Sequence, residues 1–181
     1  MTSRPEFTGL ILAGGRASRM GRDKALLRLG GVTLLDQARD LLCHAGAAKT
    51  VILGRPDEAD GLADNDPGAG PARAISSAID GLSQDCMARF LVIPVDMPNL
   101  TPACLVDLME AGISACYHAQ PMPLFIRVKN LNEDARQARS VRDFASAIQA
   151  LTIPAPPDAR LFTNINTPDD FEHLSATYQA R

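Results

Sequence analysis

Residues 10–24 of the chain read LILAGGRASRMGRDK. A short apolar run ends at Gly14 and Gly15, and three arginines and a lysine follow, with Asp23 as the one acidic residue among them. Glycine lacks Cβ, so backbone N–H groups at this point can approach an anion closely. The stretch therefore predicts a phosphate-binding loop at the end of the first strand.

Two basic residues of this stretch are candidates for direct contact with a phosphate. Arg19 offers a planar fork of donors and Lys24 a mobile point charge, so a nucleoside triphosphate is the expected guest. The alternative is a tight turn followed by a solvated basic surface. The stretch has neither the GxGxxG spacing of dinucleotide folds nor the P-loop spacing of GxxxxGK followed by Ser or Thr.

The composition is that of an ordinary globular protein. The chain has 181 residues, 46% of them hydrophobic, and a formal net charge of −3, which favours one domain over residues 1–181. A pI near 5.6 leaves no broad basic face, so we expect no nucleic-acid partner. No apolar run approaches the ~18 residues of a membrane span. The chain has no CxxC pair among its four cysteines, Cys43, Cys86, Cys104 and Cys116. We therefore expect a cytoplasmic protein that does not bind membranes.

The first half of the chain alternates buried-strand patterns with helical ones. Strands are expected over 7–13, 50–53 and 90–95, and helices over 34–44, 72–82 and 103–110. In the second half we expect strands over 115–117 and 122–128 and one long helix over 135–151, whereas the prolines within 153–157 exclude a central strand. Such alternation is typical of an α/β fold whose mostly parallel sheet carries helices on both faces.

Acidic residues fall where such sheets bind their ligands, beyond the carboxyl ends of the strands. Asp96 follows the third expected strand, and a carboxylate at the end of an apolar run needs a partner. Magnesium is usually held by one or two carboxylates plus substrate phosphates, so Asp96 is the expected Mg²⁺ ligand, with a turn cap as the alternative. Asp64 opens a glycine- and proline-rich loop over 64–71 that leads into a helix.

Two asparagines near the end of the chain lack a structural explanation. Thr167 is the expected N-cap of a final helix, with Pro168 at its first position and Asp170 at its third, as in a capping box. Asn164 and Asn166 precede that cap and alternate with an isoleucine, so their amides should point to the same face.

The motifs LILAGGRASRMGRDKALL, PGAGP, VDMPNL and NINTPDDF, in this order along essentially the whole chain, resemble those of the MobA family, the molybdenum cofactor guanylyltransferases. The resemblance implies a Rossmann-like nucleotidyltransferase that uses Mg²⁺ to transfer GMP from GTP to a phosphate of molybdopterin, releasing pyrophosphate. It implies nucleotide contacts from Leu12, Ala13, Gly14, Gly15, Lys24, Asp64 and Asp96, metal binding by Asp96, and acceptor contacts from Asn164 and Asn166.

The expected chemistry is phosphoryl-type transfer by positioning and charge. An acceptor phosphate oxygen, already anionic, attacks the α-phosphorus without a general base. Arg19, Lys24 and the Mg²⁺ on Asp96 are the expected catalytic groups, because they offset the charge that builds on pyrophosphate.

GTP and molybdopterin are the expected partners of a protein that we expect to be monomeric. Transient contact with molybdenum cofactor biosynthesis proteins or apo-molybdoenzymes is also implied by the resemblance. A related cytidylyltransferase is one alternative, but that branch has LAAG in place of LAGG, so Gly14 discriminates against it. A guanine-nucleotide-binding module without catalysis is the other.

The chain departs from the MobA pattern at three places. Arg73 stands where small residues are common, Leu53 and Gly54 stand where an asparagine is frequent, and the segment 112–121 is short. These departures concern the acceptor more than the nucleotide.

Overall fold

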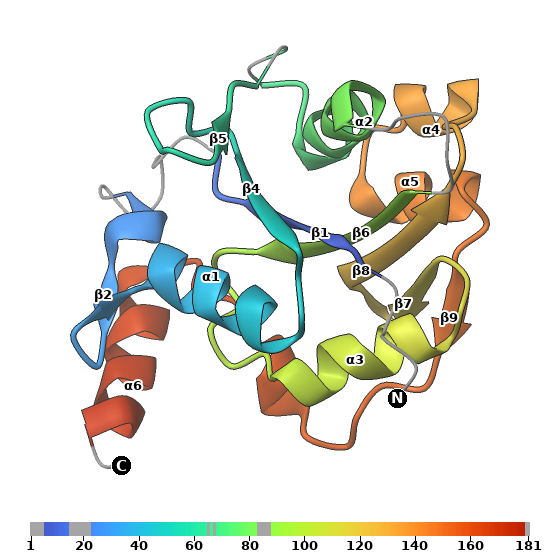
Figure 1. The fold of residues 1–181 in the computed structure, drawn as a ribbon. Coiled ribbons are helices and arrows are strands. Elements are labelled where there is room, and N and C mark those ends of the chain that lie inside the picture. The colour runs from blue at the N-terminus through green and yellow to red at the C-terminus, as the bar shows by residue number, and fades with distance from the viewer. Residues whose placement is uncertain (1–5, 15–22, 65, 67, 83–87, 180–181) are drawn as a thin grey trace.

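The computed structural model describes residues 6–14, 23–64, 66, 68–82 and 88–179. Within them, seven strands form one sheet in the order β5-β4-β1-β6-β8-β7-β9 (Figure 1). The strands are β1 Thr8–Leu12, β4 Lys49–Leu53, β5 Gly61–Leu62, β6 Ala88–Pro94, β7 Ala115–Tyr117, β8 Gln120–Val128 and β9 Leu151–Ile153. A separate hairpin pairs β2 Arg28–Leu29 with β3 Val32–Thr33.

The sheet is mostly parallel, as the sequence predicted. β1 runs parallel to β4 on one side and to β6 on the other. β4 also pairs with β5 in parallel, and β7 pairs with β9 in parallel. β8 is reversed and runs antiparallel to both β6 and β7. Since the chain moves from β1 to β4 and later crosses back to β6, the strand order reverses beside β1.

Helices cover both faces of this sheet. α1 Leu34–His44 and α3 Pro102–Glu110 lie on one face, and α2 Pro71–Leu82, α4 Glu133–Gln137 and α5 Val141–Ala147 lie on the other (Figure 1). This double cover explains the unbroken apolar runs of the central strands, where Leu10, Ile11 and Val92 are fully buried. Among the described helices, none combines the length and apolar composition that a bilayer crossing requires.

The last helix, α6 Pro168–Gln179, stands apart from these layers and packs beside β2 (Figure 1). It starts at the predicted proline. A short 3₁₀ turn, η1 Lys24–Leu26, precedes the hairpin, and another, η2 Ala159–Phe162, precedes α6 along the chain.

The prediction of one helix over 135–151 is wrong. α4 ends at Gln137, Ala138 turns to an extended ψ of 134°, and the Ser140 side chain caps the separate α5. The chain then enters β9, an edge strand. The buried positions Ala135, Ala138, Val141, Phe144 and Ala145 keep helical spacing across the break, so the apolar pattern conceals it.

Candidate active site

An ion pair joins the predicted phosphate loop to the predicted metal ligand. Lys24 opens η1, and Asp96 lies just beyond β6, where the strand order reverses. Lys24 Nζ donates to Asp96 Oδ2 at 3.0 Å, and the two side chains are 27% and 22% exposed. The pair is therefore within reach of a ligand.

Asn166 is the third member of this group. Its Oδ1 accepts a second hydrogen bond from Lys24 Nζ, also at 3.0 Å. The adjacent Ile165 is fully buried, and its backbone N–H donates to the Asp96 carbonyl oxygen at 2.9 Å. The C-terminal segment is thus bound directly to the loop after β6, and Lys24, Asp96 and Asn166 form what we call the lysine cluster.

A capping box holds this segment at the start of α6. The Asp170 carboxylate accepts from the backbone N–H groups of Asn166 at 2.9 Å and Thr167 at 2.8 Å, and Thr167 Oγ1 accepts from Asp170 N at 3.2 Å. The two backbone donors, the Thr167 hydroxyl and the charge of Lys24 lower the pKa of Asp170. The predicted cap is confirmed, and it also fixes the backbone of Asn166.

The glycine end of the predicted loop packs against the end of β4. Ala13 N donates to the Leu53 carbonyl oxygen at 3.2 Å, and the Leu12 carbonyl oxygen accepts from Val95 at 3.1 Å. A Cβ on Gly14 would lie 3.1 Å from the Gly54 Cα, and Gly54 itself has φ +82°. Gly14 is therefore required at least in part by this backbone contact.

Arg55, which no sequence motif marks, contacts residues on both sides of the predicted loop, Ala13 before it and Asp23 after it. Its Nε donates to the Ala13 carbonyl oxygen at 3.3 Å, and its Nη2 pairs with Asp23 Oδ1. Asp23 Oδ1 also accepts from Ala25 N at 3.1 Å and so caps η1. A cavity of about 270 Å³ opens beside these residues, lined also by Gly14 and Gly54.

Several predicted site residues are not brought into the lysine cluster. Asp64 lies beyond β5, where its Oδ1 accepts from Asp66 N at 3.2 Å. Asn164 is half-buried and makes no side-chain hydrogen bond to a described residue. Gly15 and Arg19 lie outside the described residues. Arg73, a departure from the MobA pattern, donates to a backbone carbonyl oxygen of α4.

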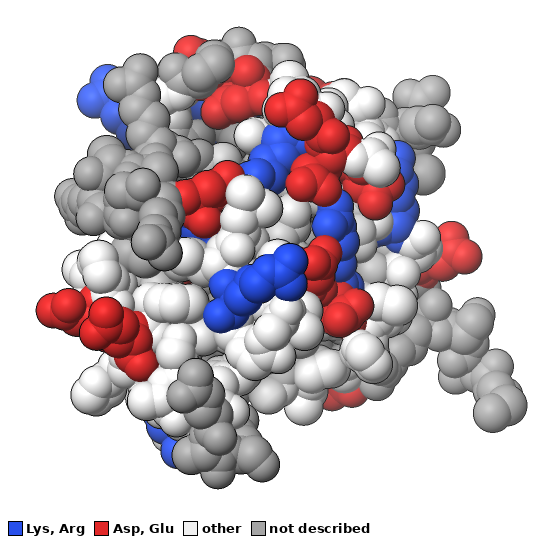
Figure 2. Space-filling model, turned by 90° about the vertical axis from the view of Figure 1, so that its left-hand side faces the viewer, with Lys and Arg blue, Asp and Glu red and all other residues white. Residues whose placement is uncertain are grey.

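Asp96 is the candidate ligand for a cation that is shared with a substrate. Within the described part of the chain, no group of three or more His, Cys, Asp or Glu side chains could hold a metal alone. Lys24 occupies Asp96 Oδ2, and no described residue donates to Oδ1. A metal at Asp96 would take its other ligands from water and phosphates, as Mg²⁺ commonly does. The carboxyl ends of β1 and β6 point to the left-hand side of the molecule in Figure 1. Figure 2 shows that side, where basic and acidic side chains lie next to each other.

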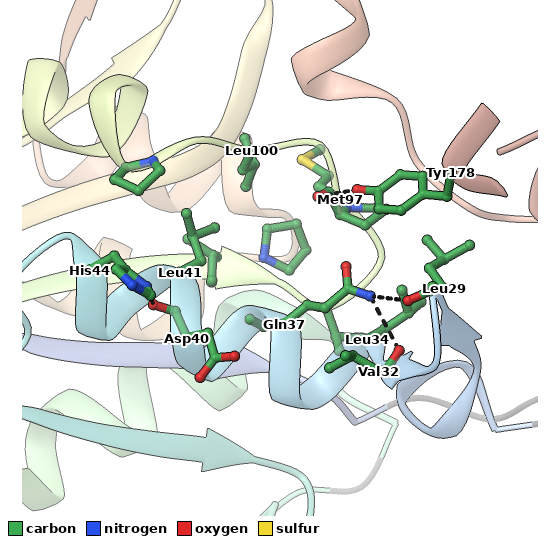
Figure 3. Close-up of a pocket in the computed structure, with 17 residues that line it drawn as sticks. Leu29, Val32, Leu34, Gln37, Asp40, Leu41, His44, Met97, Leu100 and Tyr178 are labelled. Atoms are coloured by element: carbon green, nitrogen blue, oxygen red, sulfur yellow. Dashed lines mark hydrogen bonds between the residues drawn. The ribbon is translucent and has the colours of Figure 1, made fainter. Parts of the chain in front are cut away.

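A larger cavity, of about 430 Å³, lies between α1, the β2–β3 hairpin and the loop after β6 (Figure 3). Gln37 Nε2 donates to the carbonyl oxygens of Leu29 at 2.9 Å and Val32 at 3.2 Å, which ties the hairpin to α1. The Tyr178 hydroxyl donates to the Pro98 carbonyl oxygen at 3.2 Å. No member of the lysine cluster lines this cavity, so it is separate from the candidate site.

Comparison with known proteins agrees with this geometry. The model of the MobA-like NTP transferase domain matches residues 9–153. The molybdenum cofactor guanylyltransferase of Xanthomonas euvesicatoria is 36% identical, with 96% of this chain and 97% of that protein aligned. Among solved structures, molybdopterin-guanine dinucleotide biosynthesis protein A from Archaeoglobus fulgidus has a TM-score of 0.73 at 21% identity, covering 97% of this chain and 100% of that chain. The manganese complex of Rv0371C from Mycobacterium tuberculosis has a TM-score of 0.64 at 17% identity, covering 96% of this chain and 100% of that chain.

The family model spans most of the chain, and the Xanthomonas relative aligns over nearly its whole length. The strand order and the parallel centre of the sheet agree with the nucleotidyltransferase fold that the sequence motifs implied. The resemblance found in the sequence is thereby confirmed, and the chain belongs to the MobA-like NTP transferase family.

Proposed function

We propose that this protein is a guanylyltransferase that transfers GMP from GTP to a phosphate of molybdopterin and releases pyrophosphate. The observation that carries the proposal is the lysine cluster, which sets Lys24 against Asp96 at the switch point beside β1. The name of the Xanthomonas relative, molybdenum cofactor guanylyltransferase, supports the choice of nucleotide and acceptor.

The nucleotide is proposed to bind along the carboxyl end of β1. Backbone groups from Leu12 to Gly15 approach its phosphates, and Lys24 and Arg19 supply positive charge. Asp64 is proposed to bind the nucleoside part from the loop beyond β5. Lys24 is already held by two oxygen acceptors, so an incoming phosphate replaces contacts that the protein now makes with itself.

Asp96 is proposed to hold Mg²⁺ together with phosphate oxygens of the nucleotide. Its carboxylate is partly exposed, and one of its oxygens receives no hydrogen bond from a described residue. The manganese found with Rv0371C agrees with the use of a divalent cation in this fold. When bound, such a cation offsets the negative charge of the phosphates.

The protein's own groups then act mainly through position and charge. The acceptor phosphate is anionic at neutral pH and needs no side-chain base to attack the α-phosphorus. Lys24 faces the charge that develops on the leaving pyrophosphate, where a cation in a partly dehydrated site stabilises the transition state more than the ground state.

Asn164 and Asn166 are proposed to contact the acceptor. Both precede α6 and flank the buried Ile165, and an amide offers donor and acceptor groups that suit a pterin edge or a phosphate. Asn166 also accepts from Lys24, and this contact supports a place for Asn166 between the proposed nucleotide and acceptor positions.

Pyrophosphate release tests the proposal. The purified protein is incubated with Mg²⁺ and either GTP or CTP, with and without molybdopterin. We expect release only with GTP and molybdopterin together. Release with CTP in place of GTP would identify a cytidylyltransferase, and GTP binding without any release would identify a binding module without catalysis.

A further inference from the structure

Arg55 occupies an unusual position relative to the glycine- and arginine-rich segment 14–22. Its guanidinium donates from Nε to the Ala13 carbonyl oxygen at 3.3 Å and pairs through Nη2 with the Asp23 carboxylate. Ala13 precedes that segment directly and Asp23 follows it. The Arg55 side chain is only 17% exposed, and its two contacts join Ala13 to Asp23.

The contact between Arg55 and Asp23 is linked to the lysine cluster through the turn at Lys24. The Asp23 oxygen that pairs with Arg55 also accepts from Ala25 N at 3.1 Å, and this bond caps the turn that begins at Lys24. Lys24 in turn donates to Asp96. An unbroken series of bonded groups therefore leads from the end of β4 to the lysine cluster.

We propose that Arg55 is a positioning residue that clasps Ala13 and Asp23 together and thereby holds the η1 turn, with Lys24, ready to receive the phosphates of a nucleotide. The proposal deepens the function proposed above and rests on it for the identity of the ligand. Its physical basis is preorganisation, because a lysine on a turn that is already fixed loses less conformational entropy when it binds an anion.

The alternative is that Arg55 leaves Asp23 and binds a phosphate directly. The two roles make opposite demands on Asp23. In a clasp, Asp23 is a required partner of the arginine, whereas in direct phosphate binding it is a competitor whose removal frees the cation. Substitution of Asp23 therefore discriminates between them.

The first experiment needs no nucleotide and measures backbone amide hydrogen exchange at Ala25 by NMR. We expect Arg55→Gln to speed exchange about tenfold, because Asp23 is no longer held in its capping position. Arg55→Lys keeps the positive charge but loses the planar guanidinium, so its exchange rate at Ala25 should lie between those of the wild type and Arg55→Gln. Arg136→Gln is the matched control, since it breaks an Arg–Asp pair with Asp80 at 2.9 and 3.1 Å between α4 and α2. Unchanged exchange at Ala25 in Arg55→Gln would overturn the clasp.

The second experiment measures GTP affinity by calorimetry. Asp23→Ser keeps a short side chain that can cap η1 but cannot reach Arg55. A clasp predicts that Arg55→Gln and Asp23→Ser each weaken GTP binding about tenfold and that the double variant is no weaker than either, since one interaction is lost in all three. Tighter binding by Asp23→Ser, or losses that multiply in the double variant, would contradict the clasp. A wild-type protein that binds no GTP would refute the proposed function, and the exchange at Ala25 would still decide the clasp.

Discussion

Lys24 Nζ and Asp96 Oδ2 lie 3.0 Å apart across the point where the strand order reverses, although the residues are 72 positions apart in the chain. The sheet brings them together, because β1 leads to the loop before Lys24 and its neighbour β6 leads to Asp96. Each residue partly neutralises the other while no nucleotide is bound. We expect a triphosphate with its cation to replace this pair with two separate contacts, one for each charge.

Replacing Lys24 should discriminate between nucleotides. We expect Lys24→Ala to weaken GTP binding about 10- to 100-fold and GMP binding much less, because the proposed complex sets the lost charge against the outer phosphates. Calorimetry with both nucleotides measures the difference. Lys49→Ala removes an exposed lysine at the amino end of β4 and should change neither affinity. Equal losses for GTP and GMP in Lys24→Ala would place this lysine elsewhere in the complex.

The two asparagines before α6 should differ in effect. Asn164 makes no hydrogen bond to a described side chain or backbone group, whereas Asn166 binds Lys24. We expect Asn164→Ala to lower transfer to molybdopterin about 10- to 100-fold with GTP affinity unchanged, and Asn166→Ala to lower both. Transfer rate, GTP affinity and Tm are measured on each variant. A fall in Tm and in GTP affinity for Asn164→Ala would return that residue to a structural role.

The capping carboxylate of Asp170 should make stability depend on pH. Its pKa lies below the usual value of 3.8 in the folded protein, so the ionised group stabilises the fold above about pH 4. This contribution is lost as pH falls from about 4 through the lowered folded-state pKa, because the unfolded chain binds the proton first. We expect Asp170→Asn to have a lower Tm at pH 7 and a flatter dependence of Tm on pH below 5. Parallel Tm curves for the two proteins would contradict this origin of the cap's stability.

The contact between Gly14 and Gly54 should be intolerant of a side chain. A Cβ on Gly54 would lie 2.5 Å from the Gly14 Cα, and the residue has φ +82°. Gly46, after α1, has φ +94° with nothing within 4 Å of the equivalent Cβ, so Gly46→Ala measures the strain alone. We expect about 1 kcal/mol of destabilisation for Gly46→Ala and about 1–3 kcal/mol more for Gly54→Ala. The free energy of unfolding is measured with denaturant. Equal destabilisation in Gly46→Ala and Gly54→Ala would mean that the backbones at Gly14 and Gly54 can move apart at little cost.

The parts of the fold that the sequence predicts well are those with strong local signals. The central strands appear as unbroken apolar runs because both of their faces are buried, and α3 and α6 begin at their predicted threonine caps and prolines. Asp96 could be placed at the site by the rule that ligands bind beyond the carboxyl ends of parallel strands.

The relationships that the sequence could not supply depend on long-range packing. Asn166 meets Lys24 from 142 positions away, and Arg55 meets Asp23 from 32 positions away. No local pattern marks the contact of Asn166. For the contact of Arg55, the local signal is an arginine that directly follows Gly54 at the end of β4. The strand over 122–128 is confirmed as β8, but its antiparallel direction and the break between α4 and α5 have no local signal, since burial against the same core gives both segments ordinary apolar spacing.

The most direct measurement follows the phosphates of GTP during the reaction. Purified protein is incubated with Mg²⁺, molybdopterin and GTP labelled at either the α- or the γ-phosphate, beside an Asp96→Asn variant. We predict that the α label appears in a molybdopterin dinucleotide and the γ label in pyrophosphate. Asp96→Asn should bind GTP weakly, and both labels should remain in GTP. An α label that remains in GTP or GDP with the wild-type protein, or full transfer by Asp96→Asn, would contradict guanylyl transfer at the lysine cluster.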